Sequence, residues 1–174
     1  MTVRLVLRCL LAGAALLGGS AGAHPPPPPL PVAPVPVGFA QAQRVLLAAR
    51  NVVAALSVSR VVRADRALRV VLLSVDGQVV TRVALRPDGT LAPMPDRPQK
   101  LGPASEALTA AERTDLNAQV AALTVSGAVQ ATRGEYRVPL LSGGVVVAML
   151  RLDRVNLRPL ADPVPPRPPG PGGG

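Results

Sequence analysis

Prolines gather at the two ends of the chain, and they limit how much of it can form a packed domain. The stretch Pro25–Gly38 reads PPPPPLPVAPVPVG, and residues 159–174 read PLADPVPPRPPGPGGG. Proline has a fixed φ and no backbone N–H, so such stretches favour extended polyproline II over helix or sheet. We therefore expect residues 24–38 to be an extended linker and residues 159–174 to be a disordered tail. Residues 39–158 are expected to form a single domain.

The first 23 residues have the parts of a secretory signal peptide in the required order. A positive start, an apolar run of ten residues and a small-residue cleavage site follow one another: Arg4 and Arg8, then Leu10–Gly19, then Ala21 and Ala23 before His24. A membrane-spanning helix needs about 20 apolar residues, so this run is too short to span. We expect cleavage before His24 and export to the periplasm, the cell envelope or the extracellular space. An uncleaved N-terminal anchor or a buried N-terminal helix is the alternative.

Cleavage of this segment would narrow the chemistry open to the mature protein. The chain has one cysteine, Cys9, and it lies inside the signal peptide. The mature chain is therefore expected to lack disulfides, cysteine metal sites and thiol catalysis. His24, the only histidine, would become the amino terminus, but the chain has no second histidine to complete a copper site there.

The net charge of the chain is strongly positive. It is +9, and removal of residues 1–23 takes away Arg4 and Arg8 and no acidic residue, which lowers it to +7. Such a charge favours anionic partners such as nucleic acid, anionic lipid or acidic glycan. Lys100 is the only lysine, however, and a chain rich in Arg, Ala, Gly and Pro is also typical of a GC-rich genome. The charge alone therefore does not establish a polyanion site.

Hydrophobic spacing predicts two helices. Val45, Ala49 and Val52 recur at helical spacing within residues 39–56. A second helix is predicted over residues 105–123, where Thr109 and Glu112 have the spacing of a capping box.

Five strands are predicted from Val-rich runs bounded by turn residues. The pair Asp76-Gly77 between two such runs is the strongest short-range hairpin signal in the chain. Residues 57–66 are ambiguous, because the first helix could continue or a strand could begin at Val58. Residues 87–104 contain five prolines and are expected to be a mobile exposed loop. The predicted strands are residues 67–75, 78–86, 128–132, 135–141 and 145–154.

These elements predict an α+β fold in the order α-β-β-α-β-β-β. We expect a mostly antiparallel sheet of four to five strands with two helices packed on one face. This order, with the hairpin sequence V-D-G-Q-V-V at residues 75–80, coarsely resembles profilin-like folds such as the roadblock and longin groups, and more distantly PAS-type sensor domains. The resemblance rests on element order and one common hairpin, so it assigns no functional residue.

No catalytic or metal-binding motif stands out. Asp76 and Asp88 each precede a glycine in a turn, but a strand of about nine residues would hold them roughly 30 Å apart. No glycine-rich phosphate loop, no nucleophile elbow and no metal-ligand spacing is present. The sequence therefore predicts no catalytic residue, no metal and no cofactor.

Arginines on the predicted strands are the remaining candidate site. Strand pairing is not known from the sequence, so a scattered, solvated arrangement of these residues is favoured over their gathering on one sheet face to bind an anion. The candidate anion-binding residues are Arg82, Arg86, Arg137, Arg151 and Arg154. Our leading hypothesis is an exported, non-enzymatic binding or accessory domain of the cell envelope, with an envelope protein as partner. The alternatives are a polyanion-binding module that uses these arginines and a hydrolase with an unrecognised carboxylate site.

Overall fold

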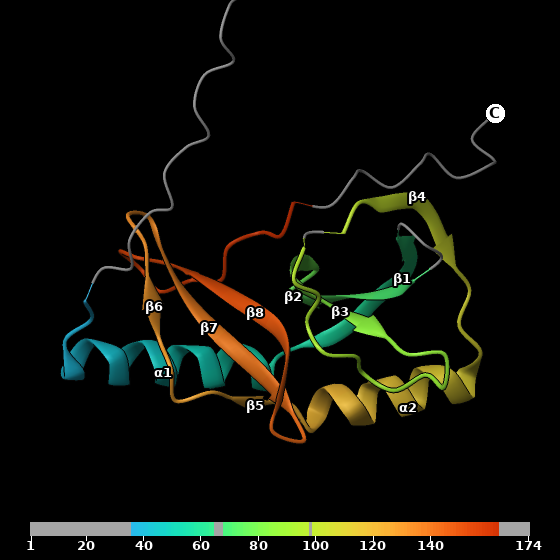
Figure 1. Cartoon of the computed structure of the whole chain (residues 1–174), viewed down its shortest axis with the longest axis horizontal. Helices are drawn as coiled ribbons and strands as arrows, with labels where there is room; N and C mark the ends of the chain where they lie inside the picture. The colour runs from blue at the N-terminus through green and yellow to red at the C-terminus, as the bar shows by residue number, and fades with distance from the viewer. Residues whose placement is uncertain (1–35, 65–67, 98, 164–174) are drawn as a thin grey trace, which may run out of the picture. The chain divides into compact units, whose positions relative to one another are not determined.

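The computed structural model describes residues 36–64, 68–97 and 99–163, and in these residues each of two helices is followed by four strands (Figure 1). The predicted signal peptide, including Ala21, Ala23 and His24, lies outside the described residues, as do residues 164–174. The elements in chain order are α1 (Phe39–Ala54), β1 (Ser57–Ala64), β2 (Arg69–Val75), β3 (Gln78–Leu85), β4 (Leu101–Glu106), α2 (Ala110–Ala121), β5 (Thr124–Val125), β6 (Gln130–Ala131), β7 (Glu135–Ser142) and β8 (Val145–Asp153).

The predicted α+β class and antiparallel pairing are confirmed, and the strands divide between two sheets. The first sheet has the order β3-β2-β1-β4. In the second, β7 pairs with β8 along one edge and with β5 and β6 along the other. The strand number exceeds the expected four to five because the ambiguous segment 57–66 forms β1, part of the predicted loop forms β4, and the short strand β5 was not predicted.

The edge strands β3 and β8 lie side by side along a line that we call the seam. No ladder of backbone hydrogen bonds joins them among the described strands. The Thr81 hydroxyl instead donates to the Met149 carbonyl at 3.0 Å. At one end of the seam the Met94 N–H donates to the Val146 carbonyl at 2.8 Å, and at the other the Asp162 N–H donates to Val79 at 2.9 Å. Two irregular segments therefore close the ends of the seam.

One hydrophobic core lies between the helices and both sheets. The N-terminal helix α1 packs on β5, β7 and β8, whereas α2 packs on β1. Both helices run along the same side of the sheets (Figure 1), as predicted. Val45 of α1, Leu116 of α2, Val61 of β1 and Leu150 of β8 all belong to one buried cluster. Neither helix of the described residues has the length and hydrophobicity needed to cross a bilayer.

A smaller apolar cluster lies on the opposite face of the first sheet. Val62, Ala64, Val70 and Leu72 are buried there, and Leu101 packs against them. Strand β2 is consequently buried on both faces, which explains why its sequence RVVLLSV is nearly continuously apolar.

The structure corrects three predicted boundaries. Residues 87–104 are not a free loop, because Leu91 bridges to Leu85 and the end of the segment forms β4. The second helix begins at Ala110 and not at residue 105, because the capping box of Thr109 and Glu112 fixes its start. The domain does not end at residue 158, because the Leu160 N–H donates to the Arg151 carbonyl at 2.9 Å and Asp162 also contacts the sheet.

The Asp76-Gly77 hairpin is confirmed. Asp76 has φ +50° and Gly77 has φ +79°, as a two-residue turn between twisted strands requires. We expect Gly77→Ala to lower the free energy of unfolding by about 1–2 kcal/mol, because a Cβ disfavours the left-handed conformation. The measurement is urea denaturation, with Gly127→Ala as the control, since Gly127 is exposed, has open space around it and lacks a positive φ. Equal losses in the two variants would contradict the turn assignment.

Candidate functional site

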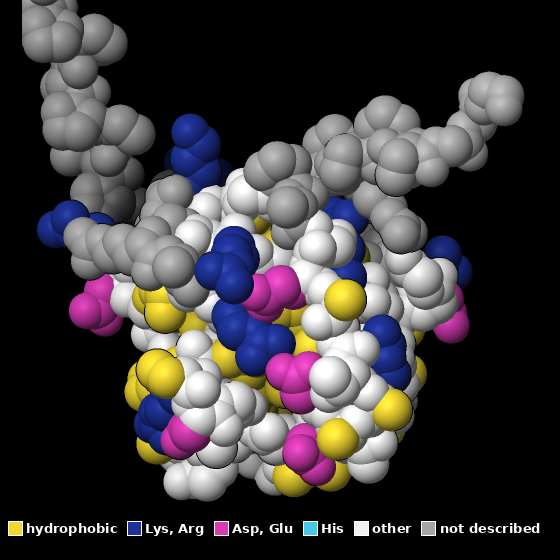
Figure 2. Space-filling model, turned by 90° about the vertical axis from the view of Figure 1, so that its right-hand side faces the viewer, with side chains coloured by type: hydrophobic (Ala, Val, Ile, Leu, Met, Phe, Trp, Pro, Cys, Tyr) yellow, Lys and Arg dark blue, Asp and Glu magenta, His cyan; other side chains and the backbone are white. Residues whose placement is uncertain are grey.

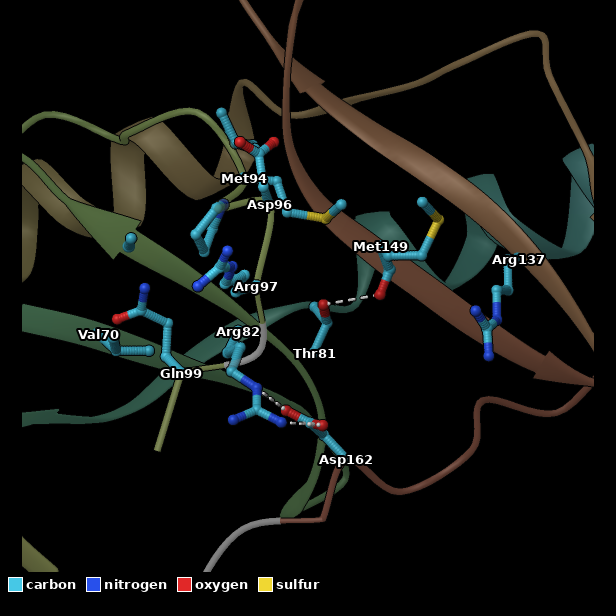
Figure 3. Close-up of a pocket in the computed structure, with 13 residues that line it drawn as sticks. Val70, Thr81, Arg82, Met94, Asp96, Arg97, Gln99, Arg137, Met149 and Asp162 are labelled. Carbon is cyan, nitrogen blue, oxygen red and sulfur yellow. Dashed lines mark hydrogen bonds and ion pairs between the residues drawn. The ribbon is translucent and has the colours of Figure 1, made fainter. Parts of the chain in front are cut away.

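A groove of about 390 Å³ lies at the seam, and we take it as the candidate site (Figure 3). Neither helix contributes to its lining. Its walls come from β2, β3, β7, β8, residues 94–97, Gln99 and Asp162. The groove therefore depends on residues from most parts of the domain.

The pleat of the strands brings alternate residues to the groove. On β3, Arg82 and Ala84 share one face, and Val70 of β2 lies opposite Ala84 in the register. On β8, Val147 and Met149 are two residues apart and both line the groove. Side chains two residues apart point to the same face of a strand, so both edges of the seam present apolar groups there.

Methionine forms a notable part of this apolar lining. The chain has three methionines, and all but Met1 line the groove, namely Met94 and Met149. Methionine is flexible and polarizable, and it adapts to ligands of irregular shape. The Oε1 atom of Gln99 is buried at the groove without a donor among the described residues.

Arg82 forms a two-pronged ion pair at one end of the groove. Its Nε lies 2.7 Å from Oδ2 of Asp162, and its Nη2 donates to Oδ1 at 2.8 Å (Figure 3). The Asp162 side chain is largely buried. This pair therefore holds residues 158–163 against the sheet and leaves Arg82 largely neutralised.

Glu135 holds two arginines that would otherwise repel each other. Arg137 of β7 and Arg151 of β8 are directly opposite in the register. The Glu135 carboxylate, 8% exposed, lies 2.6 Å from Nε of Arg137 and 2.6 Å from Nη2 of Arg151. Burial raises the pKa of Glu135, but hydrogen bonds and charge from Arg151 and Arg137 outweigh it, so the pKa lies below its usual range. Arg137 binds Glu135 through Nε, so this pair leaves the two terminal nitrogens of Arg137 unused.

The five predicted anion-binding arginines do not form one site. Arg82 and Arg137 line the groove, and Arg151 shares Glu135 with Arg137. Arg86 is exposed at the end of β3, beside Asp88. Arg154 donates to the Thr132 carbonyl at 3.0 Å, and its guanidinium lies 5.7 Å from the centre of the Tyr136 ring. The prediction thus named two residues of the groove and missed its apolar lining and both carboxylate partners.

Acidic residues also accompany the arginines elsewhere on the surface. On the side that carries β4, positive and negative side chains alternate around apolar groups (Figure 2). Glu106 binds both Arg63 and Arg69, and Arg69 also binds Glu112. The charges of Arg63 and Arg69 are therefore balanced by carboxylates on this face.

A second cavity, of about 360 Å³, bears on the hydrolase alternative, because Asp88, Glu112 and Asp115 line it. The hydroxyl and the N–H of Thr90 donate to Asp88 and lower its pKa. The N–H and hydroxyl of Thr109, together with Arg69, lower the pKa of Glu112. A glycosidase needs a carboxyl group whose pKa is raised so that it can donate a proton.

Within the described part of the chain, no three histidine, cysteine or acidic side chains are placed to hold a metal ion.

No protein-family model, no curated protein and no solved structure matches the chain. The resemblance in element order to profilin-like folds therefore gains no support from a solved structure. The geometry of the groove and its ion pairs carries the functional argument.

We expect Glu135→Gln to lower the free energy of unfolding by about 1.5–3 kcal/mol at neutral pH, because two charged hydrogen bonds are weakened. The folded pKa of Glu135 is lowered, so its contribution is complete above the unfolded value of about 4.3 and is lost as pH falls through the folded pKa. The gap between wild type and variant should therefore shrink in acid. Urea denaturation at neutral pH and in acid measures this difference in the free energy of unfolding. Asp115→Asn, at an exposed position, is the control. A gap that widens in acid would refute the assignment.

Proposed function

We propose that the protein is an exported, non-enzymatic binding domain of the cell envelope and that the seam groove is its ligand site. The groove carries this proposal. Its volume of about 390 Å³ falls in the range of small-ligand sites, and its lining combines apolar side chains with a few charged groups. Val147 and Ala84 are buried residues of the two sheets that line the groove, so the groove is present without rearrangement of the strands.

The placement of the acidic groups supports a binding role over a hydrolytic one. Glu135 and Asp162 are each held by arginine near the groove. Asp88 and Glu112, in the second cavity, have lowered pKa values and remain ionised at neutral pH. Glu135, Asp88 and Glu112 all have lowered pKa values, so none of these three is suited to donate a proton to a substrate.

The sequence supports an accessory role outside the cytoplasm. The predicted signal peptide would export the domain, and the proline-rich composition of residues 24–38 suits a spacer between the domain and its surroundings. Among the candidate polyanion-binding arginines, Arg82, Arg137 and Arg151 are paired with carboxylates, which weakens the field that a polyanion would meet. The groove is therefore the better-supported site.

The groove proposal is tested with Met149→Glu, which places a carboxylate in the apolar lining. We expect this change to weaken binding of the neutral dye N-phenylnaphthylamine by at least about tenfold, because a charge loses hydration when an apolar ligand covers it. Fluorescence titration measures the affinity. Val145→Glu is the control, because Val145 lies on the same strand, is 46% exposed and does not line the groove. Absence of dye binding to the wild type, or equal loss in both variants, would refute the proposal.

The export proposal is tested by the mass of the mature protein. Expression in a bacterial host should yield a protein outside the cytoplasm whose intact mass corresponds to a chain beginning at His24. Ala23→Leu should block this cleavage, because the protease requires small residues at the site. Ala33→Leu, in the linker, should leave it unchanged. An uncleaved chain found in the cytoplasm would contradict export.

A further inference from the structure

We propose that the ligand of the groove is a small amphipathic anion, with its apolar body on Met94, Val147 and Met149 and its carboxylate-type head on Arg137. This inference rests on the proposed function, because it names the ligand class of the same groove. It adds that the ligand carries a negative charge and that Arg137 binds this charge.

The ends of the seam favour a small molecule over a polymer. The Met94 to Val146 hydrogen bond crosses the seam at one end, and the Asp162 to Val79 hydrogen bond crosses it at the other. An extended peptide or a nucleic acid strand lying along the groove would have to break one of these crossings. A molecule that fits a space of about 390 Å³ need not break either.

The lining between these crossings suits an apolar body. Val147 is 2% exposed and Ala84 is 7% exposed, so they form a firm wall. Met94 and Met149 are more exposed and flexible, and their side chains can move to cover a bound chain. The apolar area that a ligand covers here would provide the main driving force for binding.

Arg137 is the group best placed to hold an anionic head. It lines the groove, and Glu135 fixes its guanidinium through Nε alone. The two terminal nitrogens are therefore available to a carboxylate, and a planar guanidinium matches the two carboxylate oxygens. Arg82 is less suited, because both Nε and Nη2 already bind Asp162.

The other charges of the groove do not favour a cation. Glu135 and Asp162 are already bound by arginines. Asp96 and Arg97 are adjacent, both exposed and both part of the lining, so their charges offset each other. The net preference of the groove is therefore for a negative head.

Isothermal titration calorimetry with decanoate, decanol and decylammonium, each below its aggregation concentration, tests the inference. We expect decanoate to bind wild type at least about tenfold more tightly than either of the others, the difference that one charge-assisted hydrogen bond provides. Arg137→Gln should remove this preference, and Arg137→Lys should retain part of it. Arg151→Gln is the matched control, because it also deprives Glu135 of one partner but does not line the groove.

The outcomes separate the ligand class from the function of the groove. Equal affinities of the wild type for the three compounds would overturn the proposal of an anionic head, and so would equal losses of decanoate affinity in Arg137→Gln and Arg151→Gln. In either case, binding of the neutral dye would still support the groove as a ligand site. Dye binding without any decyl compound binding would also overturn the proposal of an anionic head. Failure of every ligand, the dye included, would refute the proposed function itself. Urea denaturation of each variant ensures that a lost signal is not lost folding.

Vesicles distinguish a free amphiphile from a membrane lipid, since both can present an apolar chain with an anionic head. Sedimentation with vesicles of phosphatidylglycerol and phosphatidylcholine tests the membrane source. Decanoate binding without sedimentation supports a free ligand. Sedimentation without decanoate binding would overturn the inference.

Discussion

One apolar core holds the two sheets together, and every other feature of the domain depends on it. The helix at the N-terminal end, α1, packs on the C-terminal sheet, while α2 packs on β1 of the N-terminal sheet. Each helix therefore covers strands of the sheet that the other half of the chain contributes. Because the core contains mainly Val, Leu and Ala, its stability comes from many modest contacts such as those of Val45, Leu116 and Leu150. The domain is thus expected to unfold as one unit.

The groove follows from the way the sheets meet. On the helix side, the common core covers both sheets across the seam. On the opposite side, the described strands β3 and β8 pack side by side without a ladder, and the hydrogen bond from Thr81 to Met149 links them. The segments that carry Met94 and Asp162 close the two ends and leave the middle open. The groove therefore forms along the seam, where β3 and β8 are not paired through their backbones.

Local patterns predicted the local features, whereas the site depended on long-range pairing. The Asp76-Gly77 turn and the capping box of Thr109 and Glu112 were predictable because neighbouring residues determine them. Strand β4 was not, because Gly102 and Pro103 indicate a loop, and β4 forms through the pairing of Leu101, Ser105 and Glu106 with the distant strand β1. Of the candidate site, Arg82 and Arg137 were predicted from strand alternation. Their partners Asp162 and Glu135 were missed, because a contact across 80 residues or a cross-strand arginine pair depends on the register.

The carboxylate partners of the arginines change what the positive charge of the chain implies about its ligand. A net charge of +9 suggests a surface that attracts polyanions. In the fold, however, Glu135 neutralises much of the charge of Arg137 and Arg151 and at the same time fixes the Arg137 side chain. Fixing the guanidinium lowers the entropy that a ligand must overcome to bind it. The carboxylate therefore weakens long-range attraction and improves short-range recognition, which favours one small anion in the groove over a charged polymer on the surface.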